Sequence, residues 1–185
     1  MPRKWLQKIR DLANTLFFRT ASVATLLFGF GGVFHVDHIR NGEVLQTYHA
    51  KNQVVDVGMN ALLGIMFDSV TQITTWYIGL VDNASFSAFA NADTAASHSG
   101  WVESVAYSDS NRITWGAGTA SARSITNATA ATFNINATAT IHGIFVVSNK
   151  TKGGTSGTLW SEAAFGSNVV VNSGDQLKVT YTVSG

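Results

Sequence analysis

The chain has 185 residues, no cysteine and a formal net charge of +1. This length allows one domain with a sizeable core, or one domain with an appendage, and excludes two large domains. The absence of cysteine excludes disulfide bonds and thiolate zinc sites, so stability has to come from core burial, from assembly or from both.

The N-terminal end carries the excess of basic side chains. Residues 1–51 contain seven basic and three acidic residues, so this segment has a charge of +4 and the rest of the chain a charge of −3. Residues 3–18 have the apolar spacing of an amphipathic helix, and residues 20–34 follow as an uncharged run that contains glycine. We expect residues 1–32 to form an arm that binds a partner through the apolar side chains Trp5, Leu6, Ile9, Leu12, Leu16, Phe17, Phe28 and Phe30.

Three other interpretations of this arm are less well supported. A membrane span needs about 20 apolar residues, and Arg19 interrupts the apolar run, so we expect no membrane span. A secretory signal would need a small-x-small cleavage site followed by polar sequence, which the segment lacks. Specific nucleic-acid binding would need a denser cluster of Lys and Arg, so we expect no specific nucleic-acid partner.

Residues 33–185 are expected to form one β domain that starts with a hairpin over residues 33–50. The pair Asn41-Gly42 lies between two apolar runs and is typical of a two-residue type I′ turn, in which both residues have positive φ. The period then changes over residues 51–68, where apolar residues follow the spacing of a short helix. We expect Asp56 to be the N-cap of this helix, and the helix to pack across one end of the sheets.

From residue 71 to the C-terminus the pattern predicts the main sheets. Short apolar or alternating runs separated by turn residues indicate strands, and residues 141–147 are apolar on both faces, as in a strand covered on each side. Near the end, Val169–Val171 and the alternating residues 176–183 flank the turn Asn172–Asp175, so we expect a hairpin there. These elements predict an all-β fold, with a β-sandwich or jelly-roll body, the N-terminal helical arm and one short helix.

One group of residues resembles a metal site. His35 and Asp37 would share one face of a strand, His38 would point to the other face, and His49 would lie across the hairpin. The spacing is not diagnostic of any metal, and ordinary polar hairpin residues explain it better. We therefore assign no metal site.

Two further groups resemble catalytic or cofactor sites. Ser97 and His98, with Asp93 and Glu103 nearby, offer a nucleophile, a base and a carboxylate, but they fall in a Ser- and Ala-rich loop rather than on a rigid scaffold. The glycine-rich segment Lys152–Thr158 leads into an expected strand, whereas a phosphate loop leads into a helix. We assign no catalytic residue and no cofactor, and we expect a protein that is not an enzyme.

Several short motifs of residues 50–185 resemble a group of small tailed-bacteriophage virion proteins; the first fifty residues lie outside the resemblance. The motifs are Lys51-Asn52, Gly58–Leu63, Trp76–Leu80, His98–Glu103, Gly157–Ser161 and Gly174–Leu177. The resemblance implies a virion structural protein that decorates or cements the capsid shell, or else belongs to the tail. It also implies the major capsid protein as a partner and a homo-oligomer, for which a trimer at capsid threefold positions is one arrangement.

Two binding functions remain open beside capsid decoration. A tail or receptor-binding protein would present an exposed groove, for which Phe86, Phe89 and Trp101 near the long loop 82–99 are the candidates. A carbohydrate-binding module would need a row of solvent-exposed tryptophans. The tryptophans available for such a row are Trp76, Trp101, Trp115 and Trp160.

Overall fold

A computed structural model describes residues 29–185 of the chain. In this range it contains eleven strands and one helix. Their bounds are β1 Gly31–Arg40, β2 Glu43–Lys51, β3 Gln53–Val54, α2 Asp56–Phe67, β4 Trp76–Asp82, β5 Val102–Ser104, β6 Ile113–Trp115, β7 Ser124–Thr126, β8 Ala131–Asn134, β9 Ala139–Val147, β10 Leu159–Val171 and β11 Gln176–Ser184.

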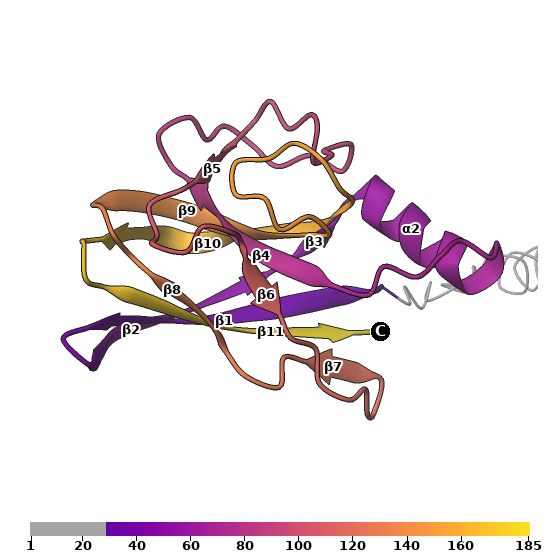
Figure 1. The fold of residues 1–185 in the computed structure, drawn as a ribbon, viewed down its shortest axis with the longest axis horizontal. Coiled ribbons are helices and arrows are strands. Elements are labelled where there is room, and N and C mark those ends of the chain that lie inside the picture. The colour runs from indigo at the N-terminus through magenta and orange to yellow at the C-terminus, as the bar shows by residue number, and fades with distance from the viewer. Residues whose placement is uncertain (1–28) are drawn as a thin grey trace, which may run out of the picture.

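The strands form two antiparallel sheets, which lie one above the other in Figure 1. Sheet A has the order β2-β1-β11-β7, and β8 pairs with the first half of β11. Sheet B has the order β3-β10-β9-β4-β5, and β6 pairs with the first half of β4. The predicted all-β class is confirmed by this arrangement.

Both sheets contribute to one main core. Leu177, Val179 and Tyr181 of β11 are fully buried, as the alternation in the sequence predicts, and they pack in the same cluster as apolar side chains of β4, β9 and β10. The Tyr181 ring stacks on Phe34 with its centroid 4.1 Å away. Each fully buried large apolar side chain contributes about 1.5–3 kcal/mol to folding, so this cluster is the main source of stability.

A second, smaller core lies on the outer face of sheet B. The loop between β4 and β5 folds over this face, and its Trp101 packs against Phe145 of β9. The loop therefore covers the side of β9 that does not face sheet A. The prediction that residues 141–147 form a strand covered on each side is confirmed.

The predicted hairpin at residues 33–50 is present as β1 and β2. Asn41 and Gly42 have φ values of 53° and 85°, as a type I′ turn requires, and Arg40 pairs with Glu43 across the turn. The register shifts once, between His38 and Ile39, and is regular from there to Lys51.

The predicted helix is present as α2, but the expectation that Asp56 is its N-cap is wrong. The N-cap is Val55, which makes no side-chain capping bond, and Asp56 is the first residue of the helix. Val55 is held in an extended conformation because its N–H donates to Trp160 O of β10 at 3.2 Å. Gly58 then lies against the same strand, where a Cβ atom would come within 2.5 Å of Trp160 O.

The expected hairpin around residues 172–175 is also wrong. Val169–Val171 end β10 in sheet B, whereas β11 belongs to sheet A, so this turn carries the chain from one sheet to the other. A hairpin within one sheet and a crossover between two sheets have the same turn residues and the same strand patterns. The sequence pattern therefore does not distinguish them. The turn is held by buried Asp175, whose contacts are described below.

The Tyr181 hydroxyl joins three elements in the core. It accepts hydrogen bonds from Asn52 Nδ2 at 2.7 Å and from Trp160 Nε1 at 2.9 Å. Tyr181→Phe leaves these two donors without an acceptor, and we expect it to lower the free energy of unfolding by about 1–3 kcal/mol. Urea titration measures this loss, with Tyr77→Phe, at a half-buried position of β4, as the control. Equal stability of the two variants would contradict the role of the hydroxyl.

Candidate functional site

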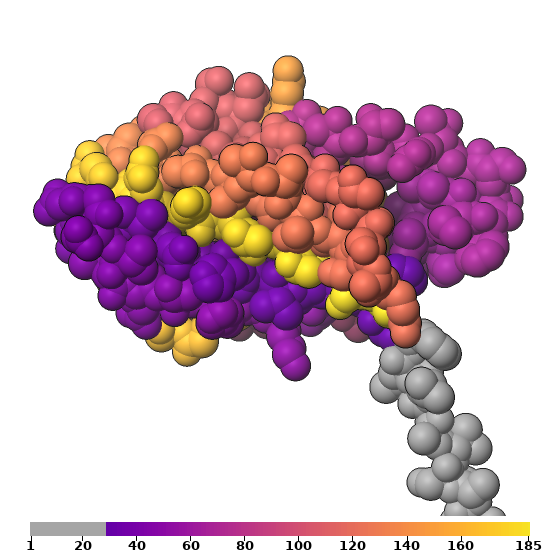
Figure 2. All heavy atoms as spheres, turned by 90° about the horizontal axis from the view of Figure 1, so that it is seen from below, coloured from indigo at the N-terminus to yellow at the C-terminus, as the bar shows by residue number. Residues whose placement is uncertain are grey.

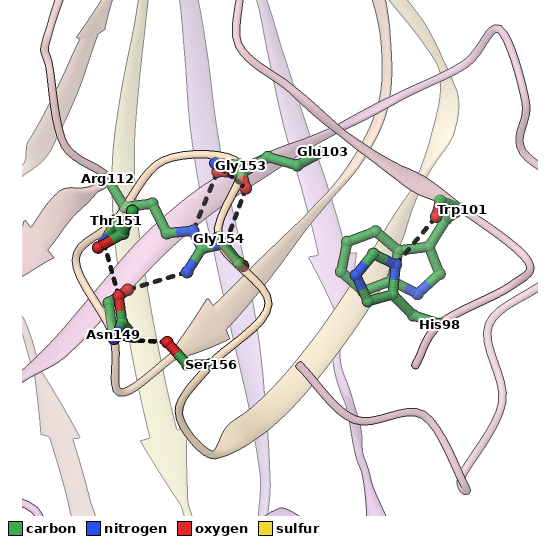
Figure 3. Close-up of polar contacts among 9 residues, drawn as sticks. All are labelled: His98, Trp101, Glu103, Arg112, Asn149, Thr151, Gly153, Gly154 and Ser156. Carbon is green, nitrogen blue, oxygen red and sulfur yellow. Dashed lines mark hydrogen bonds and ion pairs between the residues drawn. The ribbon is translucent and has the colours of Figure 1, made fainter. Parts of the chain in front are cut away.

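A dense polar cluster of the described residues surrounds Arg112, just before β6 (Figure 3). Arg112 Nε and Nη2 donate to the two carboxylate oxygens of Glu103 at 3.0 and 2.8 Å. Arg112 Nη1 donates to Asn149 O at 3.0 Å, and Nη2 also donates to Gly154 O at 2.7 Å. The guanidinium carbon lies 5.2 Å from the centroid of the Phe145 ring. Both side chains of the ion pair are almost fully buried.

This ion pair anchors the glycine-rich loop between β9 and β10. The Gly153 N–H donates to Glu103 Oε2 at 2.8 Å, so the loop bonds to both partners of the pair. Lys152 of the same loop contacts Tyr107: its Nζ donates to Tyr107 O at 2.8 Å and lies 4.2 Å from the centroid of the Tyr107 ring. Because the carboxylate and the carbonyls of the protein already bind the cations, the loop has the geometry of an anchored β-hairpin connection rather than of a phosphate cradle.

The four residues that resemble a catalytic set do not form one. His98 Nδ1 lies 2.9 Å from Trp101 O (Figure 3). The imidazole stacks on the Trp101 indole, with the two ring centroids 3.9 Å apart. Ser97 bonds through its backbone N–H to Thr94, and Glu103 pairs with Arg112. No hydrogen bond joins Ser97 to His98, so no nucleophile and base are paired here.

The four residues that resemble a metal site separate into two groups. His35, Asp37 and His49 lie together on the outer face of sheet A, with His35 Nε2 3.2 Å from Asp37 Oδ1 and the two imidazole centroids 4.7 Å apart. His38 points into the opposite face and is buried. Within residues 29–185, no group of three or more His, Cys, Asp or Glu side chains has a geometry that could hold a metal ion.

His38 instead belongs to a buried charge cluster that the sequence analysis missed. His38 Nε2 donates to Asp175 Oδ2 at 2.8 Å, and Arg40 donates to both Asp175 oxygens at 2.7 and 2.8 Å. The Asn172 N–H adds a fourth bond at 2.8 Å. Mainly because of the bond from Arg40, the pKa of Asp175 lies well below its usual range. This carboxylate therefore stays ionised and fixes the turn between the sheets to β1.

A second missed feature is a pair of buried carboxyl groups beneath the β4–β5 loop. Glu162 of β10 is 0% exposed and Asp93 of the loop is 8% exposed. The Ala90 N–H and Trp101 Nε1–H both donate to Asp93 Oδ2, at 3.2 and 3.0 Å, and neither Glu162 oxygen has a donor in hydrogen-bonding geometry among the described residues. Burial, and secondly the charge of Asp93, raise the pKa of Glu162 to about 8. At neutral pH Glu162 is therefore mostly protonated.

The tryptophans are not arranged as a carbohydrate platform in the described residues. Trp101 and Trp160 are buried, and Trp76 and Trp115 are partly buried and pack against the main core. Phe86 and Phe89 contact each other and His142, and together with Trp101 they belong to the packing beneath the β4–β5 loop. These aromatic rings hold the loop on sheet B.

Of the apolar residues predicted to bind a partner, only Phe30 lies in the described range. The other seven, Trp5 to Phe28, lie outside it. Phe30 is 47% exposed and lines an apolar groove of about 430 Å³ with Ile125, Val183 and Gly185. Figure 2 shows that the chain enters the described body at this end, beside the segment that contains β7.

The helix α2 also presents apolar side chains to solvent. Leu63, Met66 and Phe67 of its second half are exposed, as is Val70 just after it. In Figure 1 this helix lies at the same end of the molecule as the C-terminus. No helix among residues 29–185 is long and apolar enough to cross a membrane.

No protein-family model matches the chain, and no curated protein sequence matches it significantly.

Protonated Glu162 predicts a specific dependence of stability on pH. Because the pKa is raised from 4.5 to about 8 on folding, the native state retains a proton that the unfolded chain loses. The stabilisation is complete below pH 4.5 and is lost as the pH rises through about 8. We expect Glu162→Gln to reduce the fall in unfolding free energy between pH 5 and 9, as measured by urea titration. Glu43→Gln, on the exposed hairpin, is the control, and an unchanged pH slope in Glu162→Gln would contradict the assignment.

The Arg112–Glu103 pair predicts a large effect of removing one partner. Arg112→Ala leaves Glu103 buried without its cation, and we expect a loss of about 3–5 kcal/mol in unfolding free energy. The double variant Arg112→Met with Glu103→Gln removes both charges and should be more stable than Arg112→Ala. Thermal unfolding measures both effects, and trypsin cleavage after Lys152 reports release of the loop. A double variant no more stable than Arg112→Ala would show that the unpaired charge is not the cause.

Proposed function

We propose that the chain is a structural protein of a tailed-bacteriophage virion, and that it decorates or cements the capsid shell. The observation that carries this proposal is the apolar end of the body. There, the Phe30 groove and the exposed residues of α2 lie at the end of the body where the described residues begin. Residues 1–28, which precede them in the sequence, carry an amphipathic apolar pattern. Exposed apolar patches such as these two are typical of interaction sites.

We take the body to be a β-sandwich, in which the two sheets and their shared core form a rigid platform. Support comes from the main core, to which both sheets contribute, and from the loops that are held by buried ion pairs. Such a body changes little on binding, as suits a component of a repetitive shell. The first 32 residues act in this proposal as the arm that reaches a neighbouring subunit.

The polar clusters support a role without catalysis. Within residues 29–185, the Arg112–Glu103 pair holds the glycine-rich loop and Asp175 holds the crossover turn. His98, the one base among the catalytic candidates, is occupied by its stacking on Trp101 and its bond to the backbone. The partners in this proposal are the major capsid protein and further copies of the chain, for which a trimer is one arrangement, and the location is the virion.

A tail or fibre protein that binds a receptor or a carbohydrate is the second candidate. Two open polar grooves of about 530 and 520 Å³ favour it. One lies between residues 109–116 and 128–132, and the other between residues 82–84, 103–106 and 136–140. Glycan-array binding by residues 29–185 would favour this candidate over capsid decoration.

The proposal predicts that the arm is required for attachment. Because β1 begins at Gly31, deleting residues 1–28 removes the part of the proposed arm that precedes the described residues and leaves the ladder between β1 and β11 intact. We expect the truncated protein to stay soluble, to keep the far-UV circular dichroism of a β protein and to be lost from purified particles, as measured by quantitative mass spectrometry.

A matched control separates apolar packing from charge. Replacing Arg3, Lys4, Lys8 and Arg10 by Ser keeps the apolar pattern and should preserve incorporation, whereas Ile9→Ser with Leu12→Ser should abolish it. Equal incorporation of the truncated and full-length proteins would contradict the proposal.

A further inference from the structure

The core face of sheet A loses its cover at the end where β1 begins. Tyr181 and Val183 are successive members of the alternating series of β11 that faces the core. Tyr181 is fully buried, whereas Val183 and its partner on β7, Ile125, are only half-buried. Phe30, at the same end of the sheet, is 47% exposed. Burial therefore decreases along one core face toward this end.

The half-buried side chains line the apolar groove of about 430 Å³. All of its described lining residues belong to β7, to the end of β11 or to the segments next to β1 and β7, and none belongs to a strand of sheet B. Figure 1 shows β7 beside the end of β11. In the main core, side chains of both sheets pack together. The groove is therefore a part of the core face that sheet B does not cover.

The sequence just before Phe30 has the composition that such a groove would bury. Residues 23–28, which precede the described range, are Val, Ala, Thr, Leu, Leu and Phe, without a charged side chain. Leu26 precedes Phe30 by four residues, so the chain keeps the two within about 14 Å of each other. Gly29 lies between this apolar run and Phe30, and glycine allows the positive φ values of a tight reversal.

The covalent link favours this occupant over a second copy of the chain. A short flexible link gives an effective concentration in the millimolar range. This value exceeds the concentration of other copies in a micromolar solution. An apolar contact that is too weak to hold two separate molecules together is therefore sufficient within one molecule.

We propose that residues 23–28 fold back onto the body of the same molecule and cover the Phe30 groove, so that they complete the core at this end of sheet A. The amphipathic segment 3–18 remains the part of the arm that meets a neighbouring subunit. The contact does not depend on the proposed function, and both tests below use the isolated protein.

Hydrogen exchange of the full chain, measured by NMR, tests the cover directly. Leu26→Ser with Leu27→Ser weakens the apolar contact, and the amides of Ile125 and Val183 should then exchange at least about tenfold faster than in the wild type, because local opening governs exchange in a folded protein. The amide of Tyr48 in β2 is the reference that should not change. Circular dichroism checks that the variant folds.

A matched control makes the same chemical change outside the proposed cover. Leu12→Ser with Leu16→Ser also replaces two leucines of the first 28 residues. This variant should leave the exchange of Ile125 and Val183 as in the wild type.

Disulfide trapping provides a second test, because the chain has no cysteine of its own. Ile125 and Thr126 are neighbours on β7, so their side chains point to opposite faces of the sheet. Leu26→Cys should form a disulfide with Ile125→Cys at least about tenfold faster than with Thr126→Cys, because docking raises the effective concentration at one face only. Leu27→Cys is tested in parallel, so that a docked segment has a thiol directed to the groove.

Three results would overturn the proposal. They are unchanged exchange of the two groove amides in Leu26→Ser with Leu27→Ser, an equal acceleration in Leu12→Ser with Leu16→Ser, and equal disulfide rates at the two positions of β7. The mass of the oxidised protein shows whether the disulfide lies within one molecule. Disulfides that join two molecules at micromolar concentration would overturn the assignment to the same molecule and would show that a second copy fills the groove.

Discussion

The buried carboxylate of Asp175 is the contact on which the arrangement of both sheets depends. It receives hydrogen bonds from Arg40 and His38 of β1 and from the Asn172 N–H at the end of sheet B. Because one ionised group binds the end of one sheet and the first strand of the other, β11 starts in a fixed position beside β1. Tyr181 then lies in the centre of the core, where its hydroxyl joins the two sheets through Trp160. Arg40 remains partly exposed, which lowers the desolvation cost of the cluster.

Buried contacts also fix the connections on the outer face of sheet B. The Arg112–Glu103 pair holds one loop, and the packing of Trp101 holds another over a protonated Glu162. Long connections are thereby folded onto the sheet instead of forming an open cleft above it. Among the described residues, exposed apolar side chains lie elsewhere, on β2 and at the end that carries Phe30 and α2. A body with tightly held loops and free margins is suited to assembly, which supports the proposed structural role.

Local patterns in the sequence predicted the local elements well. Asn41-Gly42 predicted the hairpin because few residues adopt positive φ twice in succession, and the period of two in β11 predicted which of its side chains are buried. Contacts between distant residues were not predictable in this way. The crossover at Asp175 resembles a hairpin in sequence. Val55, and not Asp56, is the N-cap of α2 because the Val55 N–H bonds to β10. The partners of Arg112 and Glu162 are up to 42 and 69 positions away, so only the fold brings them together.

The central claim is that this molecule functions as a part of a larger assembly. Its most direct test is a cryo-electron microscopy reconstruction of purified particles of the phage that is proposed to encode the chain, with the copy number determined independently by mass spectrometry. The account predicts many copies of the two-sheet body on the shell, each with its N-terminal segment in contact with a neighbouring subunit. Purified particles that lack the protein, together with a monomeric protein in the soluble fraction of the lysate, would contradict it.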